Sequence, residues 1–162
     1  MKVLLTGGAG FIGGHLAERL LRLGHNVVVL DNFDPYYTIE LKEKNIDRCR
    51  TAAAATDGRF ELVKGDILDR SLVKEAVGDA DAVYHQAAQA GVRTSIEQPN
   101  KANEVNVNGT LNVLNAARST DVDRVVVASS SSVYGETEYL PFDEHHPTKP
   151  TSPYGVSKLA AE

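Results

Sequence analysis

Tyr154 and Lys158 are the residues whose types and spacing point most directly to chemistry. They stand four positions apart directly after Pro153, so a helix that begins at this proline places both side chains on one face. A phenol is a poor base at neutral pH because its pKa is about 10, but a nearby cation lowers that pKa. The spacing therefore predicts a tyrosine that acts as a general base beside an activating lysine.

A run of four serines, Ser129 to Ser132, precedes this pair at the end of a predicted strand. Ligands of open α/β sheets lie over the carboxyl ends of the strands, so we expect the serines and the tyrosine at the same edge. A serine hydroxyl there donates a hydrogen bond to a substrate oxygen whose charge changes during the reaction. A module that only binds a dinucleotide does not need this combination of side chains.

The glycine-rich segment TGGAGFIGG, residues 6–14, follows a short strand and opens a helix. Its glycines satisfy the dinucleotide spacing G-x-G-x-x-G from Gly8, and a wider spacing from Gly7 through Gly10 to Gly13. Glycines permit a tight turn and leave room for a pyrophosphate, to which the helix N-terminus offers its N–H groups. Both spacings predict a dinucleotide-binding turn.

Asp31 ends the second predicted strand, 18 residues after Gly13. A carboxylate at this place accepts hydrogen bonds from ribose hydroxyls and repels a 2′-phosphate, so the sequence favours NAD over NADP. Asp66 ends the third strand and is a candidate partner for the adenine amino group. The small residues Ala87 and Ala88 end the fourth strand and leave room for the cofactor.

The elements that must position these residues alternate between strand and helix along the chain. Apolar runs predict strands at 2–5, 26–31, 59–66, 81–88 and 123–132. Helical patterns follow at 11–23, 38–50, 69–77, 99–118 and from Pro153 onward, with 51–58 as a frayed helix end or surface loop. This alternation predicts parallel strands joined by right-handed crossovers, which is a doubly wound α/β sheet.

Composition excludes several classes of protein. The 162 residues carry a net charge of −5 with acids and bases interspersed, unlike the basic footprint of a nucleic-acid-binding protein. No apolar run approaches the roughly 18 residues that span a membrane. Cys49, the one cysteine, is interpreted as a structural thiol and fits a cytoplasmic protein, and His145 and His146 lack partners at metal-ligand spacing. We expect no membrane, nucleic-acid or metal partner.

Six ordered motifs resemble those of the extended short-chain dehydrogenase/reductases, most closely their NAD-dependent nucleotide-sugar epimerases and dehydratases. The motifs are TGGAGFIG, LDN at 30–32, GDI at 65–67, HQAA at 85–88, SSSSVYG at 129–135 and SPYGVSK at 152–158. Gln86 departs from the pattern, since relatives usually carry an apolar residue there. The resemblance implies a Rossmann-like fold with NAD bound by Gly7, Gly10, Phe11, Ile12, Gly13, Asp31, Asn32, Asp66, Ile67, Ala87, Ala88, Asn106, Tyr154 and Lys158.

The resemblance also implies a mechanism, with Ser130, Tyr154 and Lys158 as the catalytic residues. Tyr154 would take the proton from the 4-hydroxyl of the sugar, while Lys158 lowers the pKa of the phenol and holds the nicotinamide ribose. Hydride would pass from C4 of the sugar to NAD, giving a 4-keto sugar. The ring would then turn over and take the hydride back on its other face.

Two serines bear on the type of reaction. Ser131 and Ser132 occupy the positions at which the related 4,6-dehydratases carry Asp and Glu, and serines cannot replace that acid–base pair. This favours a 4-epimerase, with a 4,6-dehydratase or a non-catalytic NAD-binding fragment as the alternatives. DNFDPYY at 31–37 and HQAAQAGVRTS at 85–95 resemble UDP-glucuronate 4-epimerases, and UDP-glucose 4-epimerases share most other motifs. We expect a UDP-hexose substrate near Arg93, Ser131 and Ser132.

Residues 1–162 correspond, by the same resemblance, to an NAD-binding domain truncated before the last strands and the substrate domain. A complete protein is expected to form a homodimer. The 162-residue chain is expected to bind NAD, to lack measurable epimerase activity and to self-associate. The surfaces for this association would be the edge of strand 123–132 or the helix 99–118, which carries two apolar stripes.

Overall fold

Five apolar segments form one parallel sheet in a computed structural model that describes residues 1–137 and 139–162. The strands are β1 (Lys2–Thr6), β2 (Asn26–Asp31), β3 (Phe60–Lys64), β4 (Ala82–His85) and β5 (Arg124–Val127). Their order across the sheet is β3-β2-β1-β4-β5, and every pair is parallel. The chain therefore adds β2 and β3 on one side of β1 and then β4 and β5 on the other. This order confirms the predicted doubly wound sheet.

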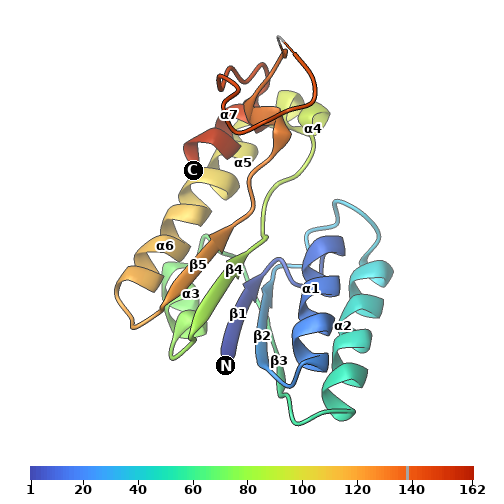
Figure 1. Ribbon diagram of the computed structural model, residues 1–162. Helices are drawn as coiled ribbons and strands as arrows, with labels where there is room; N and C mark the ends of the chain where they lie inside the picture. Colours follow the sequence, from blue (N-terminus) through green and yellow to red (C-terminus); the bar gives the residue numbers. More distant parts are fainter. Residues whose placement is uncertain (138) are drawn as a thin grey trace.

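Helical segments connect the strands and cover both faces of the sheet (Figure 1). The α-helices are α1 (Phe11–Arg22), α2 (Ile39–Ala54), α3 (Arg70–Val77), α4 (Val92–Glu97), α5 (Pro99–Asn103), α6 (Thr110–Arg118) and α7 (Pro153–Ala160). A π-helix, η1 (Glu104–Gly109), joins α5 to α6, and a 3₁₀ turn, η2 (Ser131–Val133), follows β5. Helices α1 and α2 lie side by side on one face, and α3 and α6 on the other.

Two hydrophobic clusters hold these layers together, one on each face of the sheet. The first packs Leu4 and Val83 against Val73 and Val113, which come from α3 and α6. The second packs the strands against α1 and α2 and consists of Leu5, Ala9, Ala17, Leu21, Val27, Val29, Ile46, Cys49 and Ala52. Burial raises the pKa of the Cys49 thiol to about 11, so the thiol is a packing residue, as interpreted from the sequence.

The structure corrects several element boundaries. Strand β5 ends at Val127, so the predicted strand 123–132 is too long. Helix α2 continues through Ala54, so of the two interpretations of 51–58 the helix end applies to its first half. The predicted helix 99–118 is interrupted by η1. Of its two apolar stripes, only one is covered in this chain, because Leu111 and Leu114 are 51% and 37% exposed. Helix α4 was not predicted, since its six residues are too few for a periodic pattern.

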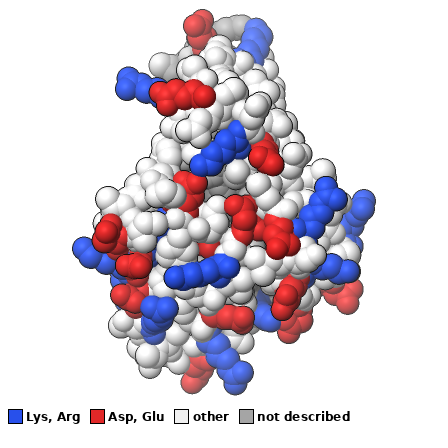
Figure 2. Space-filling view, turned by 180° about the vertical axis from the view of Figure 1, so that it is seen from behind, with Lys and Arg blue, Asp and Glu red and all other residues white. Residues whose placement is uncertain are grey.

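The surface carries no field of a single sign on the face seen in Figure 2, where acidic and basic side chains are interspersed. That distribution agrees with the net charge of −5. Among the described residues, no helix combines the length and the apolar character needed to cross a membrane.

Candidate functional site

A cavity of about 510 Å³ lies at the carboxyl ends of the parallel strands. Its walls come from the turn after β1, from the ends of β2, β3 and β4, and from α7. The predicted residues that line it are Gly7, Gly10, Phe11, Ile12, Gly13, Asp31, Asn32, Asp66, Ile67, Ala87, Ala88, Tyr154 and Lys158. Most of the predicted site is thus brought together at one place, where open α/β sheets bind ligands.

The glycine turn is shaped by backbone contacts that exclude larger residues. Gly7 has a φ of +70°, and a Cβ there would lie 2.6 Å from the backbone nitrogen of Ala87. A Cβ at Gly13 would collide with the carbonyl oxygen of Gly7, because α1 begins directly against the turn. The first N–H groups of α1 have no partner within the helix, and the residues that carry them, Phe11 to Gly13, line the cavity.

Asp31 is 5% exposed, and both of its oxygens accept hydrogen bonds from the protein. Oδ2 accepts from the N–H of Ala9 at 3.0 Å, which ties the end of β2 to the glycine turn. Oδ1 accepts from the N–H of Phe33 at 2.8 Å and from the ammonium of Lys42 at 3.0 Å. The carboxylate therefore braces the turn as well as lining the cavity, and the buried ion pair with Lys42 was not predicted.

The next wall combines the ends of β2 and β3. The amide of Asn32 donates to Oδ2 of Asp66 at 2.8 Å, and Oδ1 of Asp66 accepts from the N–H of Leu68 at 2.9 Å. Ile67 is 4% exposed and belongs to the hydrophobic core, so it lines the cavity on the side of the core. These contacts fix one carboxylate and one amide side by side at the rim.

Helix α7 supplies the predicted general base and its lysine. The hydroxyl of Ser152 accepts from the N–H of Gly155 at 3.0 Å, and Pro153 starts the first turn. Tyr154 and Lys158 both line the cavity, as their spacing predicts. Burial lowers the pKa of Lys158, which is 5% exposed, while the carboxylate of Glu162 opposes the shift.

The serine run is only partly at the cavity. Ser129 lines it and donates to the carboxylate of Glu162, whereas Ser130, Ser131 and Ser132 do not contribute to its walls. Ser130 caps the 3₁₀ turn, with its hydroxyl accepting from the N–H of Ser132 at 3.2 Å. Accepting this bond leaves the proton of the Ser130 hydroxyl available for donation to another group.

Asn106 is 1% exposed and takes no part in lining the cavity, in contrast to the predicted cofactor contact. Its amide bonds both backbone groups of Gln89, accepting from the N–H at 2.7 Å and donating to the carbonyl at 3.2 Å. It also donates to the hydroxyl of Ser157 on α7 at 2.9 Å. Asn106 therefore holds the helix that carries Tyr154 against the segment after β4. Arg93 is exposed and lies outside the cavity walls.

Sequence reasoning missed four cavity residues in the segment after Asn32. They are Asp34, Tyr36, Tyr37 and Lys42. The hydroxyl of Tyr37 is buried beside Gly10 without a hydrogen bond of normal geometry. Burial raises the pKa of Tyr37, and the carboxylate of Asp31 adds to the shift while the N–H of Phe11 opposes it. The motif DNFDPYY contained the two tyrosines, but no spacing rule assigns them to the site.

Curated proteins similar to this chain include sugar-nucleotide epimerases. The chain is 42% identical to UDP-glucuronate 4-epimerase 2 of Arabidopsis thaliana, over 100% of this chain and 37% of that protein. It is 38% identical to UDP-glucose 4-epimerase of Mus musculus, over 99% of this chain and 47% of that protein. The chain thus spans about half, or less, of the length of these relatives.

Solved structures agree with these relatives. A crystal structure of a UDP-glucuronic acid 4-epimerase mutant from Bacillus cereus, with UDP-4-deoxy-4-fluoro-glucuronic acid and NAD, matches with a TM-score of 0.87. The identity is 36%, and the match covers 99% of this chain and 50% of the other. A family model described as GDP-mannose 4,6 dehydratase matches residues 4–162. The chain therefore belongs to this family of nucleotide-sugar dehydratases and epimerases, as its six motifs predict.

Proposed function

We propose that the complete protein is an NAD-dependent 4-epimerase that inverts C4 of a UDP-hexose. The observation that carries this proposal is the cavity itself, which brings Tyr154 and Lys158 together with the glycine turn and Asp31. A dinucleotide held by the turn and the carboxylate would extend toward α7. The base and the redox cofactor would then meet at one substrate carbon.

The residues present fit NAD. The glycines of the turn carry no side chains, and neighbouring backbone lies where a Cβ would stand. A pyrophosphate can therefore approach the backbone at the start of α1. Asp31 and Asn32 supply polar groups at the end of β2, where a ribose is recognised. The oxygen of the Tyr37 hydroxyl interacts with the N–H of Phe11, and its own proton remains available for donation to a ligand.

In this proposal NAD, when bound, supplies the hydride chemistry at C4 of the sugar. Tyr154 removes the proton from the 4-hydroxyl and returns it to that oxygen when C4 of the 4-keto sugar is reduced on its opposite face. Lys158 stabilises the phenolate of Tyr154, and its burial strengthens that interaction because water screens it poorly. The Ser130 hydroxyl donates to the reacting oxygen, which is supported by its position one residue beyond the cavity wall at Ser129.

An epimerase is favoured over a dehydratase although the matching family model is described as a dehydratase. Elimination of water needs an acid and a base beside the sugar, and Ser131 and Ser132 supply neither at neutral pH. The similar proteins named as UDP-glucuronate and UDP-glucose 4-epimerases support a UDP-hexose as the substrate. We further propose that the complete protein is a homodimer.

Substitution of Tyr154 by Phe tests the proposal in a chain extended to the length of the relatives. Loss of the base should lower turnover of UDP-glucose or UDP-glucuronate by about 10²–10⁴-fold, the usual contribution of general acid–base catalysis. NAD affinity, measured by calorimetry, should remain nearly unchanged. Tyr134→Phe is the matched control, because Tyr134 lies outside the cavity walls. A fully active Tyr154→Phe enzyme would refute the mechanism.

A further inference from the structure

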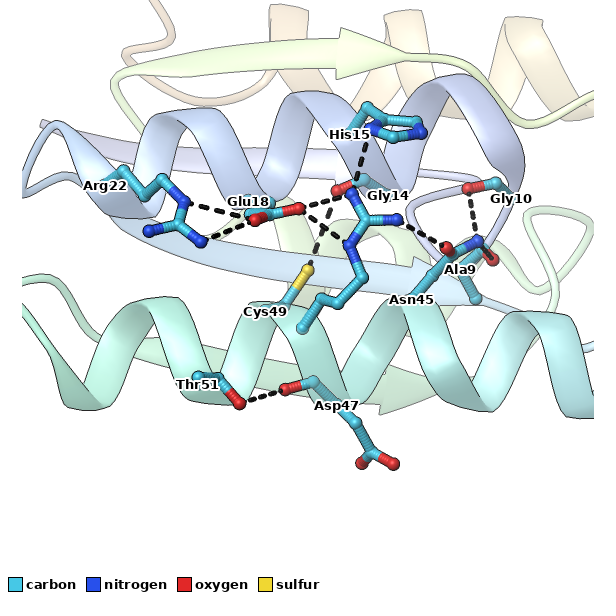
Figure 3. A network of polar contacts seen from close by, with 11 residues as sticks. Ala9, Gly10, Gly14, His15, Glu18, Arg22, Asn45, Asp47, Cys49 and Thr51 are labelled. Atoms are coloured by element: carbon cyan, nitrogen blue, oxygen red, sulfur yellow. Dashed lines mark hydrogen bonds and ion pairs between the residues drawn. The ribbon is translucent and has the colours of Figure 1, made fainter.

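A polar network outside the cavity connects α2 to the glycine turn (Figure 3). Asn45, on α2, donates from Nδ2 to the carbonyl oxygen of Ala9 at 3.0 Å and to that of Gly10 at 3.1 Å. Asn45 does not line the cavity. It therefore contacts the dinucleotide-binding turn from behind.

The two carbonyl groups determine the direction of two N–H groups. In a planar trans peptide, the C=O and the N–H point in opposite directions. Holding the Ala9 carbonyl turns the N–H of Gly10 away from α2, and this N–H donates to the Gly7 oxygen at 3.1 Å. Holding the Gly10 carbonyl likewise turns away the N–H of Phe11, the first residue of α1 and part of the cavity wall. The Gly10 oxygen also accepts from the N–H of Gly14 at 2.9 Å, so Asn45 adds to a bond of α1 there, whereas among the described residues Asn45 is the one side chain that holds the Ala9 oxygen.

The Asn45 side chain is itself held in one orientation. Its Oδ1 accepts from Nη1 of Arg48 at 3.3 Å, so the oxygen and nitrogen of the amide have separate partners. The guanidinium of Arg48 donates to Glu18 on α1, from Nε at 2.8 Å and also from Nη2. Arg22 holds the same carboxylate from the other side, and these two arginines lower the pKa of Glu18.

Gly14 provides the space that Asn45 occupies. A Cβ at Gly14 would lie 2.9 Å from Cβ of Asn45 and 3.0 Å from its Cγ. The absence of a side chain on this turn of α1 therefore lets α2 approach closely enough for the amide to reach the turn. The second glycine of the pair Gly13–Gly14 has a role separate from the room left for the pyrophosphate.

We propose that Asn45 is a positioning residue that holds the peptide planes of the glycine turn, so that the first N–H groups of α1, beginning with that of Phe11, are oriented for a dinucleotide pyrophosphate. This inference rests on the proposed binding of NAD and adds a residue outside the cavity to the binding machinery. Because Asn45 acts on the peptide planes of the turn, it affects ligands that carry the pyrophosphate. Its influence on the adenosine portion, which the ends of β2 and β3 recognise, is small.

The test compares Asn45→Leu, which keeps the volume and removes the donor, with the wild-type 162-residue chain. The affinities for NAD and ADP-ribose, measured by calorimetry, should fall by about tenfold, as expected for loss of one or two hydrogen bonds. The affinity for adenosine, measured by NMR titration, should stay the same. Arg48→Met, which leaves Asn45 in place without its Oδ1 partner, should give a smaller loss for NAD.

Amide hydrogen exchange of the ligand-free chain gives an independent measurement. The N–H of Gly10 should exchange faster in Asn45→Leu than in the wild type. Its exchange rate should be unchanged in the control Asn115→Leu, because the exposed Asn115 side chain makes no hydrogen bond to the described residues. Unchanged NAD affinity, or an equal loss for adenosine, would overturn the inference. A wild-type chain that binds no NAD would instead refute the proposed function, and Gly10 exchange alone would then decide the positioning role.

Discussion

Lys42 changes the electrostatics of the carboxylate on which the choice of cofactor depends. Its ammonium lies 3.0 Å from Oδ1 of Asp31, and both side chains are less than 10% exposed. Asp31 repels a 2′-phosphate, whereas a lysine beside it attracts one. The expected preference for NAD over NADP would therefore reflect the difference between two opposed charges, and Lys42 should reduce it.

Substitutions of the two partners should shift cofactor preference in opposite directions. Lys42→Met should increase the ratio of NAD affinity to NADP affinity, because the attraction for a 2′-phosphate is removed. Asp31→Ala should decrease the ratio, because Lys42 remains without its carboxylate. Calorimetry with both cofactors measures the ratios, and thermal unfolding controls for the cost of an unpaired buried charge. Equal affinities for NAD and NADP in the wild type would contradict the role of Asp31.

The serines allow a second comparison at this scale. In a chain of family length, Ser130→Ala should lower turnover by about 10²–10³-fold if its hydroxyl stabilises the reacting oxygen. Ser129→Ala should have a much smaller effect, because that hydroxyl is bonded to Glu162. Steady-state rates with a UDP-hexose separate the two. A larger loss for Ser129→Ala would move the catalytic role to that residue.

Spacing along the chain predicted the residues whose role depends on local geometry. Gly7, Gly13 and Asp31 are placed by one strand–turn–helix unit and the strand after it, so short-range rules suffice. Lys42 and Asn45 reach the turn only through the packing of α2 on α1. Such contacts depend on tertiary structure, and no periodicity of polar residues on α2 distinguishes them from surface residues.

A chain of buried hydrogen bonds joins elements that are distant in sequence. His85, on β4, bonds through Nδ1 to the hydroxyl of Thr6 at 2.6 Å and through Nε2 to that of Thr110 at 2.9 Å. Thr110 donates to the carbonyl of Asn106 at 2.6 Å, and Asn106 donates to Ser157 on α7. The strand that begins the glycine turn is thereby linked to the helix that carries Tyr154.

His85 should make the stability of the chain depend on pH. Burial, followed by the charge of Lys158, lowers the pKa of His85 from 6.5 to about 4. Between these pH values the unfolded chain binds a proton that the folded chain does not, so stability falls as the pH decreases through this window. The loss amounts to roughly 3 kcal/mol by pH 4. Urea unfolding of wild type and His85→Asn at pH 7 and 4.5 measures this loss of stability. An equal change in unfolding free energy between the two pH values for both proteins would contradict the role of His85.

Helical periodicity predicted the segment 99–118 but not its interruption. A π-helix adds one residue and leaves the α-helical spacing of apolar residues before and after it unchanged. The apolar pattern therefore predicts one continuous helix. The end of β5 was misplaced for a related reason. Ser130 still has an extended backbone, but neither it nor Ser129 pairs with a residue of β4. Sequence pattern identifies which segments are extended, whereas pairing determines where a strand ends.

At the scale of the whole molecule, apolar surface gathers along one edge. Strand β5 pairs with β4 on one side and with no strand of the described residues on the other. Val126 on β5 is 37% exposed, and Leu111 and Leu114 on α6 are also exposed. An open strand edge is a template for pairing with a second chain, and exposed leucines add apolar area to bury.

The 162-residue polypeptide should therefore self-associate. Light scattering after size exclusion should show a mass above that of the monomer that rises with concentration. Val126→Lys should reduce the association if the strand edge pairs, because a charge blocks edge-to-edge contact. Leu111→Lys should reduce it if α6 forms the contact, and Asn115→Lys on the same helix is the control for added charge. A monomer at high concentration would count against both surfaces.

The π-helix constrains the number of residues in its segment, because each residue added or removed changes how the helix turns. The π segment holds one residue more than an α-helix would need, so deletion of one residue between Glu104 and Gly109 would leave a regular helix and keep α5 and α6 in their orientation. Residues inside the segment would turn about the helix axis by up to about 100°, the advance of one α-helical residue. Val113 and Ala116 could stay in the core, but Asn106 would then face away from Ser157. Members of the family that retain this asparagine should tolerate many substitutions in the segment and no single-residue insertions or deletions.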